Sequence, residues 1–339
     1  MNICVNGYGT IGKRVAEALS AHPKLRLVGA SKYTPDQDAR LANIKGIRLF
    51  VPSESIKNFE SKGIAVSGSV DDMIAQADLV IDASSDGKGL ANKNGVYLPR
   101  SKPALFQGGE SEDIAEMSFN ARSNFDAAKG KRYVRVVSCN TTAYCRLLKP
   151  LAEHYTIKHV DAFLIRRGAD PNDAKGSALN AVEWKAKSHH AHDVQTVIPA
   201  ISIASTAFKV PHTIAHINSM SIQFDEVPSK DAIAELFSKE SRVAMLNSAT
   251  TSAQIMEAAR DIGVKRYDTY AVSLLMNTLQ VNGNSAFMSF FVPQESIVVP
   301  ENVDAVCAHF GMGKQESMKI TDDLLGIGRI KKELEAVFA

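Results

Sequence analysis

Cys139 is the residue whose type and setting point most directly to covalent chemistry. Residues 133–137 are mostly β-formers, and apolar side chains recur at helical spacing after Asn140, so the thiol should lie where a short strand gives way to a helix. In the first turn of a helix, unpaired backbone N–H groups and the positive end of the helix dipole lower the pKa of a thiol. We therefore expect a nucleophilic thiolate at Cys139. The alternative interpretation is a small buried hydrophobic side chain.

A glycine-rich turn near the start of the chain lies between a predicted strand and a predicted helix. Residues 2–6 are largely apolar, residues 13–21 have a helical pattern, and Gly-Tyr-Gly-Thr-Ile-Gly stands between them. In a Gly-x-Gly-x-x-Gly turn the first glycine permits the bend, the second lets a pyrophosphate approach the backbone, and the third lets helix and strand pack closely. A dinucleotide cofactor is therefore expected here. The predicted contacts are Gly7, Gly9, Thr10, Ile11 and Gly12.

The end of the second predicted strand bears on the choice between NAD and NADP. A carboxylate there would hold the ribose 2′-hydroxyl of NAD and repel the 2′-phosphate of NADP. This strand, residues 25–30, is instead followed by Ser31, Lys32, Tyr33 and Thr34. Lys32 could pair with a 2′-phosphate, and Ser31 or Thr34 could hydrogen-bond it, so we expect NADP to be accepted as well as NAD. Taken alone, Lys32 could also be a solvated lysine at a strand end.

The remaining patterns predict the fold class. Residues 79–83 and 104–106 resemble buried parallel strands that end in Gly- or Ser-rich loops, which makes Gly109 a candidate backbone contact with the cofactor. Residues 45–68 should form short strands and turns. Longer alternating runs predict a largely antiparallel sheet, at 158–166, 213–224 and 286–292. Helices are predicted at 231–246, 253–261 and 315–338. We therefore predict an α/β chain with an N-terminal Rossmann doubly wound parallel sheet and an α+β second domain.

Composition and charge exclude several classes of protein. A chain of 339 residues that is 45% hydrophobic can bury a large core and is long for one domain, so two domains are expected. A net charge of +2, without a basic run interleaved with aromatic residues, argues against nucleic acid. The chain opens directly into a strand and has no run of eighteen apolar residues, so we expect a cytoplasmic protein that does not bind membranes. Four scattered cysteines without a Cys-x-x-Cys pair fit a reducing compartment.

A histidine cluster invites a metal interpretation that the neighbouring residues do not support. Ser-His-His-Ala-His occupies residues 188–192. Apart from Asp193, no nearby cysteine or paired carboxylate completes a plausible ligand set. We expect no metal.

A nicotinamide cofactor and a thiol in one chain point to oxidation of an aldehyde. Attack by the Cys139 thiolate gives a tetrahedral thiohemiacetal, which expels hydride to the nicotinamide and leaves a thioester. A base must take the hydroxyl proton, and histidine suits that role near neutral pH. The chain has nine histidines. One of them, His216, lies on a predicted strand, where a satisfied core histidine is the alternative interpretation.

The string Ser-Cys-Asn-Thr-Thr at 138–142 resembles the active-site cysteine segment of phosphorylating glyceraldehyde-3-phosphate dehydrogenases, and its flanks resemble the archaeal type of that family. Further matching blocks follow the order of the family and span nearly the whole chain. They are residues 6–12, 106–110, 166–167 with 169–170, 188–190 and 294–302. Two stretches depart from the pattern, at 183–187 and 273–283.

The resemblance implies a role for each matching position. Cys139 is the nucleophile. His216 is the acid–base histidine, because it follows Thr213-Ile214 as the histidine of the family follows Thr-Leu. Asn218 stands where the family often has another histidine. The implied cofactor contacts in this part of the chain are Arg167 and Gln294. The implied substrate contacts are Ser138, Asn140, His189 and His190.

The resemblance also implies the reaction, which is oxidation of D-glyceraldehyde 3-phosphate with NAD or NADP and inorganic phosphate to 1,3-bisphosphoglycerate, in glycolysis or gluconeogenesis. The residues favour phosphate over water as acceptor of the acyl group. No carboxylate lies close in sequence to Cys139 to activate water. Side chains of the types that bind phosphate are present instead: Arg166, Arg167, His189, His190, Thr141 and Thr142.

The resemblance further implies the domain boundaries and the assembly. Residues 1–138 and 302–339 are expected to form the NAD(P)-binding Rossmann domain, and residues 139–301 the catalytic domain. A homotetramer is expected.

Two alternative functions remain open at the level of the sequence. The first is an aspartate-semialdehyde dehydrogenase, which uses a nucleophilic cysteine in the same way on a similar architecture. The sequence motifs of that family around the thiol differ from those of this chain. A nucleotide-binding regulator could have kept the fold and lost catalysis, and intact Cys139, Asn140 and His216 argue against it.

Overall fold

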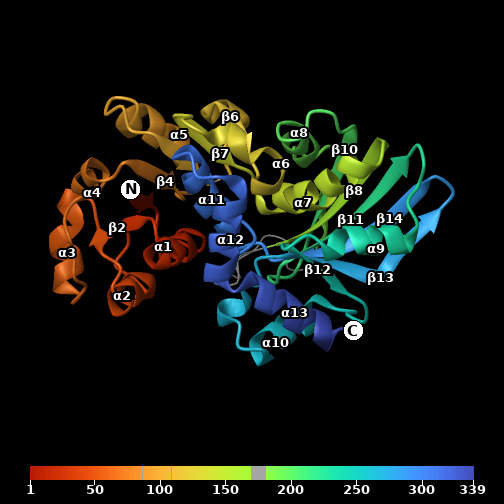
Figure 1. Cartoon of the computed structure of the whole chain (residues 1–339). Coiled ribbons are helices and arrows are strands. Elements are labelled where there is room, and N and C mark those ends of the chain that lie inside the picture. Colours follow the sequence, from red (N-terminus) through yellow and green to blue (C-terminus); the bar gives the residue numbers. More distant parts are fainter. Residues whose placement is uncertain (86, 108, 169–180) are drawn as a thin grey trace. The chain divides into compact units, whose positions relative to one another are not determined.

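The computed structural model describes residues 1–85, 87–107, 109–168 and 181–339 (Figure 1). Contacts divide these residues into two compact units. The first comprises Met1–Ser138 and Val298–Leu325, and the second comprises Cys139–Ile297 and Gly326–Ala339. Each unit contains one seven-stranded sheet. No helix in the described ranges is long and apolar enough to cross a membrane.

The sheet of the first unit is parallel throughout, with the order β3-β2-β1-β4-β5-β7-β6. Its strands are β1 (Asn2–Asn6), β2 (Arg26–Ser31), β3 (Leu49–Phe50), β4 (Leu79–Asp82), β5 (Ala104–Phe106), β6 (Met117–Phe119) and β7 (Tyr133–Val136). The strand order reverses between β1 and β4, as in doubly wound nucleotide-binding folds. The prediction of an N-terminal Rossmann-type sheet is confirmed. Ligands of such sheets bind outside the carboxyl ends of the strands at this reversal.

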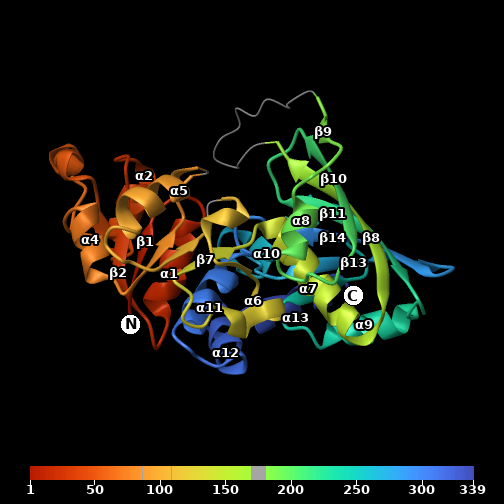
Figure 2. The ribbon, with the colours of Figure 1, turned by 90° about the horizontal axis from the view of Figure 1, so that it is seen from above.

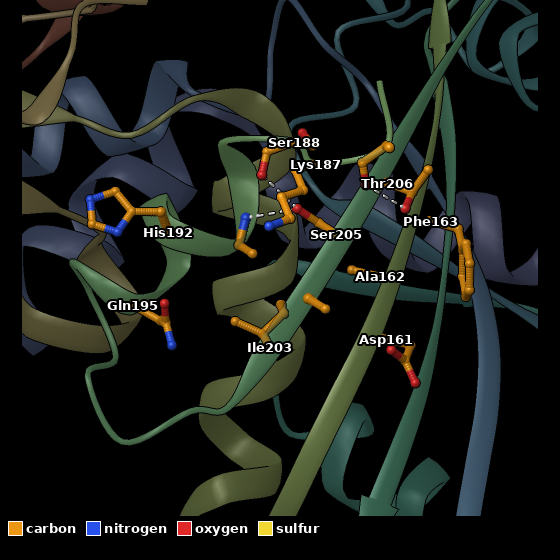
Figure 3. A pocket seen from close by; sticks show the side chains of 13 residues that line it. Asp161, Ala162, Phe163, Lys187, Ser188, His192, Gln195, Ile203, Ser205 and Thr206 are labelled. Atoms are coloured by element: carbon orange, nitrogen blue, oxygen red, sulfur yellow. Dashed lines mark hydrogen bonds between the residues drawn. The ribbon is translucent and has the colours of Figure 1, made fainter. Parts of the chain in front are cut away.

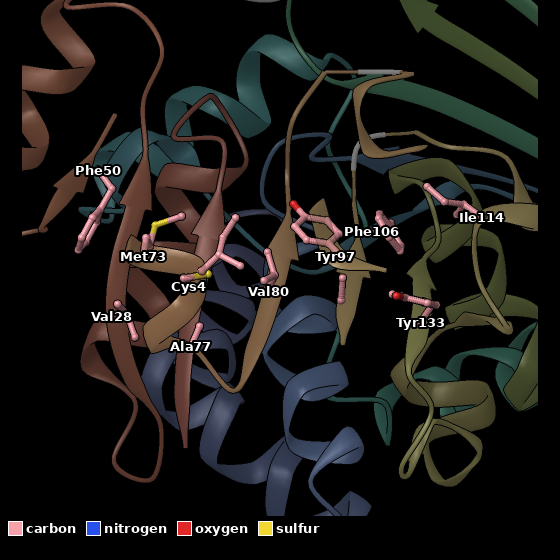
Figure 4. Packing of buried hydrophobic residues seen from close by; sticks show 12 residues of the cluster. Cys4, Val28, Phe50, Met73, Ala77, Val80, Tyr97, Phe106, Ile114 and Tyr133 are labelled. Atoms are coloured by element: carbon pink, nitrogen blue, oxygen red, sulfur yellow. The ribbon is translucent and has the colours of Figure 1, made fainter. Parts of the chain in front are cut away.

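Helices cover both faces of this sheet because the strands are apolar on both sides. They are α1 (Gly12–Ala21), α2 (Gln37–Ile44), α3 (Ile56–Ser61), α4 (Val70–Gln76), α5 (Lys88–Asn92), α6 (Ala121–Asn124), α11 (Val299–His309) and α12 (Lys314–Leu325). On one face, Met73 and Ile74 of α4 and the ring of Tyr97 pack with buried residues of the strands, among them Val80 and Phe106 (Figure 4). On the other face, α1 contacts α11, which also contacts β5 and β7.

A buried carboxylate on α11 fastens the segment Val298–Leu325 to the first unit. Glu301 is fully buried, and its Oε2 accepts hydrogen bonds from the N–H of Ala121 at 2.6 Å and from Nδ2 of Asn120 at 3.2 Å. Because a buried carboxylate needs partners of this kind, α11 and the start of α6 depend on each other.

The second sheet has the order β12-β13-β14-β11-β8-β10-β9. Its strands are β8 (Ile157–Arg167), β9 (Glu183–Lys185), β10 (Ile203–Val210), β11 (His216–Phe224), β12 (Val243–Leu246), β13 (Val272–Asn282) and β14 (Ser285–Val292), of which β8, β10, β11 and β14 run side by side in Figure 2. The pairs β8–β10 and β12–β13 are parallel, and the other pairs are antiparallel. The prediction of a largely antiparallel second sheet is confirmed. The helices of this unit are α7 (Cys139–His154), α8 (His190–Gln195), α9 (Lys230–Ser238), α10 (Ser252–Asp261) and α13 (Ile327–Val337).

Two predicted stretches of secondary structure are wrong. The helix expected at 231–246 ends at Ser238, and Val243–Leu246 form the edge strand β12, which pairs with β13. Pairing with a distant strand overrides the local helical pattern there. Residues 45–68 hold the two-residue strand β3, an isolated bridge at Val51, a short 3-10 helix at Ser53–Ser55 and the helix α3, not a series of short strands.

The expected terminal helix 315–338 is interrupted, and its second half belongs to the other unit. Gly326 has a φ of +66°, a left-handed conformation that ends α12 and redirects the chain. Ile330, Leu334 and Phe338 then lie one turn apart and pack with Leu246 of β12 and residues of α10, the neighbour of α13 in Figure 1. Residues 326–339 are thus part of the second unit, whereas the sequence predicted them in the cofactor-binding domain.

Leu334→Ala should lower the free energy of unfolding by about 2–5 kcal/mol, since Leu334 is buried and its removal leaves a cavity between α13, α10 and β12. Glu333→Ala on the same helix, whose carboxylate pairs with Arg329 near the surface, should change it by no more than about 0.5 kcal/mol. Urea denaturation measures both values. Hydrogen exchange should rise at 243–261 in the leucine variant, and a rise confined to residues 298–325 would contradict the unit assignment.

Candidate active site

Cys139 is the first residue of α7, and Val137 and Ser138 separate it from the end of β7 at Val136. All four cysteines lie in the described ranges, where Cys139 is partly exposed and Cys4, Cys145 and Cys307 are buried. Ser138, the last residue of the first unit, immediately precedes the thiol. The expected position of Cys139 at a helix start is found, and its exposure sets it apart from the three buried cysteines.

The protonation state of Cys139 differs from the one expected. Burial raises the pKa of the thiol to about 11, and the charge of Glu295 acts in the same direction. Arg166, Arg167 and the backbone N–H of Asn140 oppose this rise without cancelling it. The prediction that the helix start would favour the thiolate is therefore wrong for this site, because removal of the sulfur from water outweighs the helix terminus. At pH 7 a thiol with this pKa is ionised in about one molecule in 10⁴.

Hydrogen bonds join the first turn of α7 to β11 and α8. Oδ1 of Asn140 accepts from Nδ2 of Asn218 at 2.8 Å, and Nδ2 of Asn140 lies 3.4 Å from Nε2 of His190. Nδ1 of His190 is 2.6 Å from the hydroxyl of Ser188. With Oδ1 of Asn140 facing a donor, its Nδ2 donates to His190, so the lone pair of this imidazole is on Nε2 and its proton on Nδ1. The structure thus brings together two of the predicted substrate contacts, Asn140 and His190.

His216 lies at the start of β11, on the same buried strand face as Asn218. Its Nδ1 accepts a hydrogen bond of 3.1 Å from the backbone N–H of Arg167. Because a backbone N–H can only donate, the neutral ring must carry its proton on Nε2. Burial, and then the charges of Arg167 and Arg166, hold the pKa of His216 well below its usual value of 6.5, so the ring is neutral at pH 7. In this form His216 donates from Nε2, whereas the sequence predicted a proton acceptor.

The two adjacent arginines at the end of β8 have different surroundings. The guanidinium of Arg167 is ion-paired with Glu295, and its Nη1 lies 3.4 Å from the carbonyl oxygen of Thr213. Nε of Arg166 is buried and finds no hydrogen-bond partner among the described residues. The charge of Arg166 acts on the pKa values of Cys139, His190 and His216, so this guanidinium lies among the candidate catalytic groups.

Two further predicted contacts lie nearby in the second unit. Oε1 of Gln294 is buried and, like Nε of Arg166, finds no hydrogen-bond partner among the described residues. Buried polar atoms without partners mark places where a ligand can bind. His189 is mostly exposed and stacks on His190 with ring centroids 4.1 Å apart. Of the matching blocks, residues 169–170 lie outside the described residues.

A cavity of about 470 Å³ is lined in part by Ser188 (Figure 3). Its wall includes Lys187, His192 and Ser205. Oγ of Ser205 donates to the carbonyl oxygen of Ser188 at 3.0 Å and accepts from the N–H of Ala191 at 3.0 Å. These bonds hold the segment that carries His190. No group of three or more His, Cys, Asp or Glu side chains is placed to hold a metal ion in the described part of the chain.

The glycine-rich turn of the first unit has the geometry that a dinucleotide needs. Gly7 has a φ of +111°, and a Cβ there would meet the carbonyl oxygen of Ala83 at 2.7 Å. A Cβ on Gly12 would lie 1.8 Å from the carbonyl oxygen of Gly7, so only glycine lets α1 pack on β1. Among the described residues, a Cβ on Gly9 would meet nothing within 4 Å, and no side chain caps the N-terminus of α1. Open space therefore lies where a pyrophosphate would meet the helix.

The residues after β2 are more constrained than the sequence suggested. Oγ of Ser31 donates to Oδ1 of Asn6 at 2.7 Å and accepts from the N–H of Gly7 at 2.8 Å, so it braces the turn. Nζ of Lys32 lies 2.8 Å from Oδ2 of Asp36. Ser31 is also fully buried, which leaves Thr34 as the better placed of the two predicted hydroxyl contacts. Gly109, after β5, is exposed and has a φ of +88°.

Two charged residues of these sites were missed at the level of the sequence. Glu295 directly follows Gln294 but is far from Cys139 in the sequence, so closeness in sequence to the thiol does not point to it. Asp36 lies beyond the end of β2, and its pairing with Lys32 depends on the turn between β2 and α2. The signal in the sequence that points to Glu295 is its position within the matching block 294–302.

The rate at which iodoacetamide inactivates the free protein should rise about tenfold for each pH unit from pH 7 to pH 10, because the reagent attacks the thiolate and burial raises the pKa of Cys139 to about 11. Mass spectrometry identifies Cys139 as the alkylated residue. A rate that levels off below pH 8 would mean a stabilised thiolate and would contradict the effect of burial.

Two family models match parts of the chain. Residues 138–289 match the model described as "Glyceraldehyde 3-phosphate dehydrogenase, C-terminal domain", and residues 1–97 match "Dihydrodipicolinate reductase, N-terminus". Together with the glycine-rich turn, these matches indicate a pyridine nucleotide cofactor.

Curated relatives match the chain over nearly its full length. The glyceraldehyde-3-phosphate dehydrogenase of Sulfurisphaera tokodaii is 42% identical, over 96% of this chain and 97% of the relative. That of Archaeoglobus fulgidus is 39% identical, over 97% and 99%. Glyceraldehyde-3-phosphate dehydrogenase 1 of Methanosarcina acetivorans is 42% identical, over 96% and 98%. With identity at this level over nearly the whole of each protein, the chain belongs to the glyceraldehyde-3-phosphate dehydrogenase family.

Proposed function

We propose that the chain oxidises D-glyceraldehyde 3-phosphate, with NAD or NADP and inorganic phosphate, to 1,3-bisphosphoglycerate through a thioester on Cys139. The observation that carries the proposal is the grouping, in one unit, of the Cys139 thiol, two buried neutral histidines and Arg166, whose Nε has no partner among the described residues. Membership of the family supports the same reaction.

The first unit is the proposed cofactor domain. Gly7, Gly9 and Gly12 shape the turn, and the uncapped start of α1 offers backbone N–H groups to a pyrophosphate. A bound pyridine nucleotide would supply the acceptor for hydride. Thr10, Ile11, Lys32 and Gly109 complete the proposed contacts in this unit, and Arg167 and Gln294 are those proposed in the second unit.

Activation of Cys139 requires that its proton be removed within the site. The raised pKa leaves too little thiolate at neutral pH, although Arg166 and Arg167 both stabilise the anion. His190 is neutral, because burial holds its pKa well below 6.5, and its lone pair on Nε2 faces Asn140 in the first turn of α7. We propose that Nε2 of His190 exchanges its hydrogen bond from Asn140 for the proton of the Cys139 thiol, with Ser188 holding the opposite ring nitrogen.

His216 acts on the oxygen of the reacting aldehyde. When the thiolate attacks the carbonyl carbon, the carbonyl oxygen becomes an alkoxide, and a donor aimed at it lowers the barrier. Nε2–H of His216 is such a donor, because Nδ1 is occupied by the N–H of Arg167. Collapse of the alkoxide with loss of hydride leaves the thioester on Cys139. His189 and Ser138 are the remaining proposed substrate contacts.

Phosphate is the proposed acceptor of the acyl group. A hydrolytic enzyme needs a carboxylate free to activate water, but the carboxylate of Glu295 is ion-paired with Arg167. The guanidinium of Arg166, by contrast, lies among Cys139, His190 and His216, and its Nε has no hydrogen-bond partner in the described part of the chain. A guanidinium in this state suits an anionic oxygen of phosphate.

The proposed assembly is a cytoplasmic homotetramer. One face of the second sheet leaves Phe163, Ile165 and Phe287 exposed, although each alternates with buried neighbours on its strand. Apolar side chains gathered on a sheet face favour contact with another protein surface. None of the four cysteines, all within the described ranges, forms a disulfide, as suits a reducing compartment.

Without phosphate, the purified protein mixed with glyceraldehyde 3-phosphate and NAD⁺ or NADP⁺ should give a burst of reduced cofactor no larger than the number of sites, because the thioester accumulates on Cys139. Added phosphate should restore steady turnover with 1,3-bisphosphoglycerate as product, and arsenate should replace it. Stopped-flow absorbance of the reduced cofactor measures the burst.

The matched control for this burst uses two cysteines of the same helix. Cys139→Ser should bind cofactor and give no burst, whereas Cys145→Ser, at a buried position on α7, should keep it. Steady turnover in phosphate-free buffer, with 3-phosphoglycerate as product, would contradict phosphate as the acceptor and leave only the thioester chemistry.

His216→Asn should slow the burst by about 10² to 10³, the usual effect of removing one donor to a developing oxyanion. His212→Asn should leave the burst rate near the wild-type value, because His212 is only half-buried and lies outside β11. Circular dichroism of both variants checks the fold. If the His212 variant is the slow one, the alkoxide donor has been assigned to the wrong histidine.

A further inference from the structure

Three buried side chains, two amides and an imidazole, form a hydrogen-bonded row from β11 through α7 to α8. Nδ2 of Asn218 donates to Oδ1 of Asn140 at 2.8 Å, and Nδ2 of Asn140 lies 3.4 Å from Nε2 of His190. None of the three residues is more than 2% exposed. Because bulk water does not compete for these groups, the hydrogen bond at one end of the row decides which atoms face each other at the other end.

The backbone of β11 holds Asn218 in place. Asn218 is paired with Leu164 of β8 on one side and with Phe290 of β14 on the other, and both of these neighbours are fully buried. Its side chain lies on the strand face that also carries His216 and Met220. The main freedom left to an amide at this position is the rotation that exchanges its oxygen and its nitrogen.

The observed orientation of the Asn218 amide leaves its oxygen unused. Oδ1 of Asn218 is buried and has no hydrogen-bond partner among the described residues. The opposite orientation would place the NH2 group there instead, and buried donors without partners are rarer in proteins than buried carbonyl oxygens without partners. Asn218 is therefore held as the donor of the row, and Oδ1 of Asn140 as the acceptor.

We infer that Asn218 is a positioning residue, which fixes the Asn140 amide and thereby keeps the lone pair of His190 on Nε2. The inference rests on the proposed function, because it concerns the base proposed for the thiol proton. With Oδ1 engaged by Asn218, Asn140 presents only its NH2 group to His190. If the Asn140 amide turned, its oxygen would require a proton on Nε2, and this nitrogen would then be unable to accept the proton of Cys139.

The test measures the burst of reduced cofactor in the full-length protein, with glyceraldehyde 3-phosphate and the tighter-binding of NAD⁺ and NADP⁺, without phosphate. Asn218→Asp should slow the burst about 10²-fold or more, the usual effect of losing a general base, because a carboxylate only accepts and therefore turns the Asn140 amide. Asn218→Leu removes the donor without adding a charge. It should slow the burst about two- to tenfold, since both orientations of Asn140 are then populated.

Met220→Leu is the matched control. Met220 is buried two residues further along the same face of β11, and exchange of methionine for leucine conserves volume. The burst rate of this variant should stay near that of the wild type. Thermal unfolding checks that each variant is folded. If the aspartate variant does not fold, the leucine variant provides the comparison.

A double-mutant cycle separates positioning of the base from a general disturbance of the site. His190→Asn alone should slow the burst about 10²- to 10⁴-fold. In that background Asn218→Asp and Asn218→Leu should have little further effect, because the base through which Asn218 acts is already absent. A substitution that disturbed Cys139 directly would slow the burst equally in both backgrounds.

The outcomes separate this inference from the proposed function. Full effects of the Asn218 substitutions in the His190→Asn background, or a normal burst rate in Asn218→Asp, would overturn the role of Asn218 and leave the dehydrogenase proposal in place. A normal burst rate in His190→Asn alone would overturn both the choice of base and this inference. Absence of a burst in the wild-type protein would overturn the proposed function and this inference with it.

Discussion

The antiparallel pairing of β8 with β11 is the constraint on which the candidate active site depends. Its register sets Asn218 opposite Leu164, which brings the start of β11 beside the end of β8. The N–H of Arg167 can then reach Nδ1 of His216. A slip of one residue would turn His216 and Asn218 to the other face of the sheet, and Asn140 would lose its partner. Backbone pairing between distant segments thus decides which ring nitrogen of the histidine carries the proton.

Burial is the largest cause of the protonation states of the titratable groups in the site. It raises the pKa of Cys139 and lowers those of His190 and His216, so each group is held in its neutral form. The two arginines at the end of β8 then supply the fixed positive charge. A neutral thiol beside cationic groups gains most when a negative charge forms, either on sulfur or on the carbonyl oxygen. The two arginines are therefore placed to stabilise a negative charge that forms on the sulfur or on the carbonyl oxygen during the proposed reaction.

Features with local causes could be predicted from the sequence. The glycine-rich turn is one, because the requirement for glycine at position 12 comes from the carbonyl oxygen five residues earlier. The strand-to-helix break before Cys139 is another. Features with distant causes could not be predicted. Pairing with β13 made β12 a strand, packing against α10 placed α13 in the second unit, and burial reversed the expected shift in the pKa of Cys139. The ion pairs of Asp36 and Glu295 likewise depend on how loops fold.

The pairing of Glu295 with Arg167 bears on why the thioester should meet phosphate and not water. A carboxylate near the thiol could accept a proton from water, and the charge of Glu295 does reach Cys139. Its ion pair with the guanidinium engages Oε1 and stabilises the carboxylate in its charged form, which makes it a weaker base. Freeing it would leave Arg167 without its partner in a buried position, which is costly. The backbone N–H of Arg167 also donates a hydrogen bond to Nδ1 of His216. Arg167 therefore both restrains the carboxylate of Glu295 and orients His216, and in the proposed reaction this arrangement favours phosphate over water as acceptor.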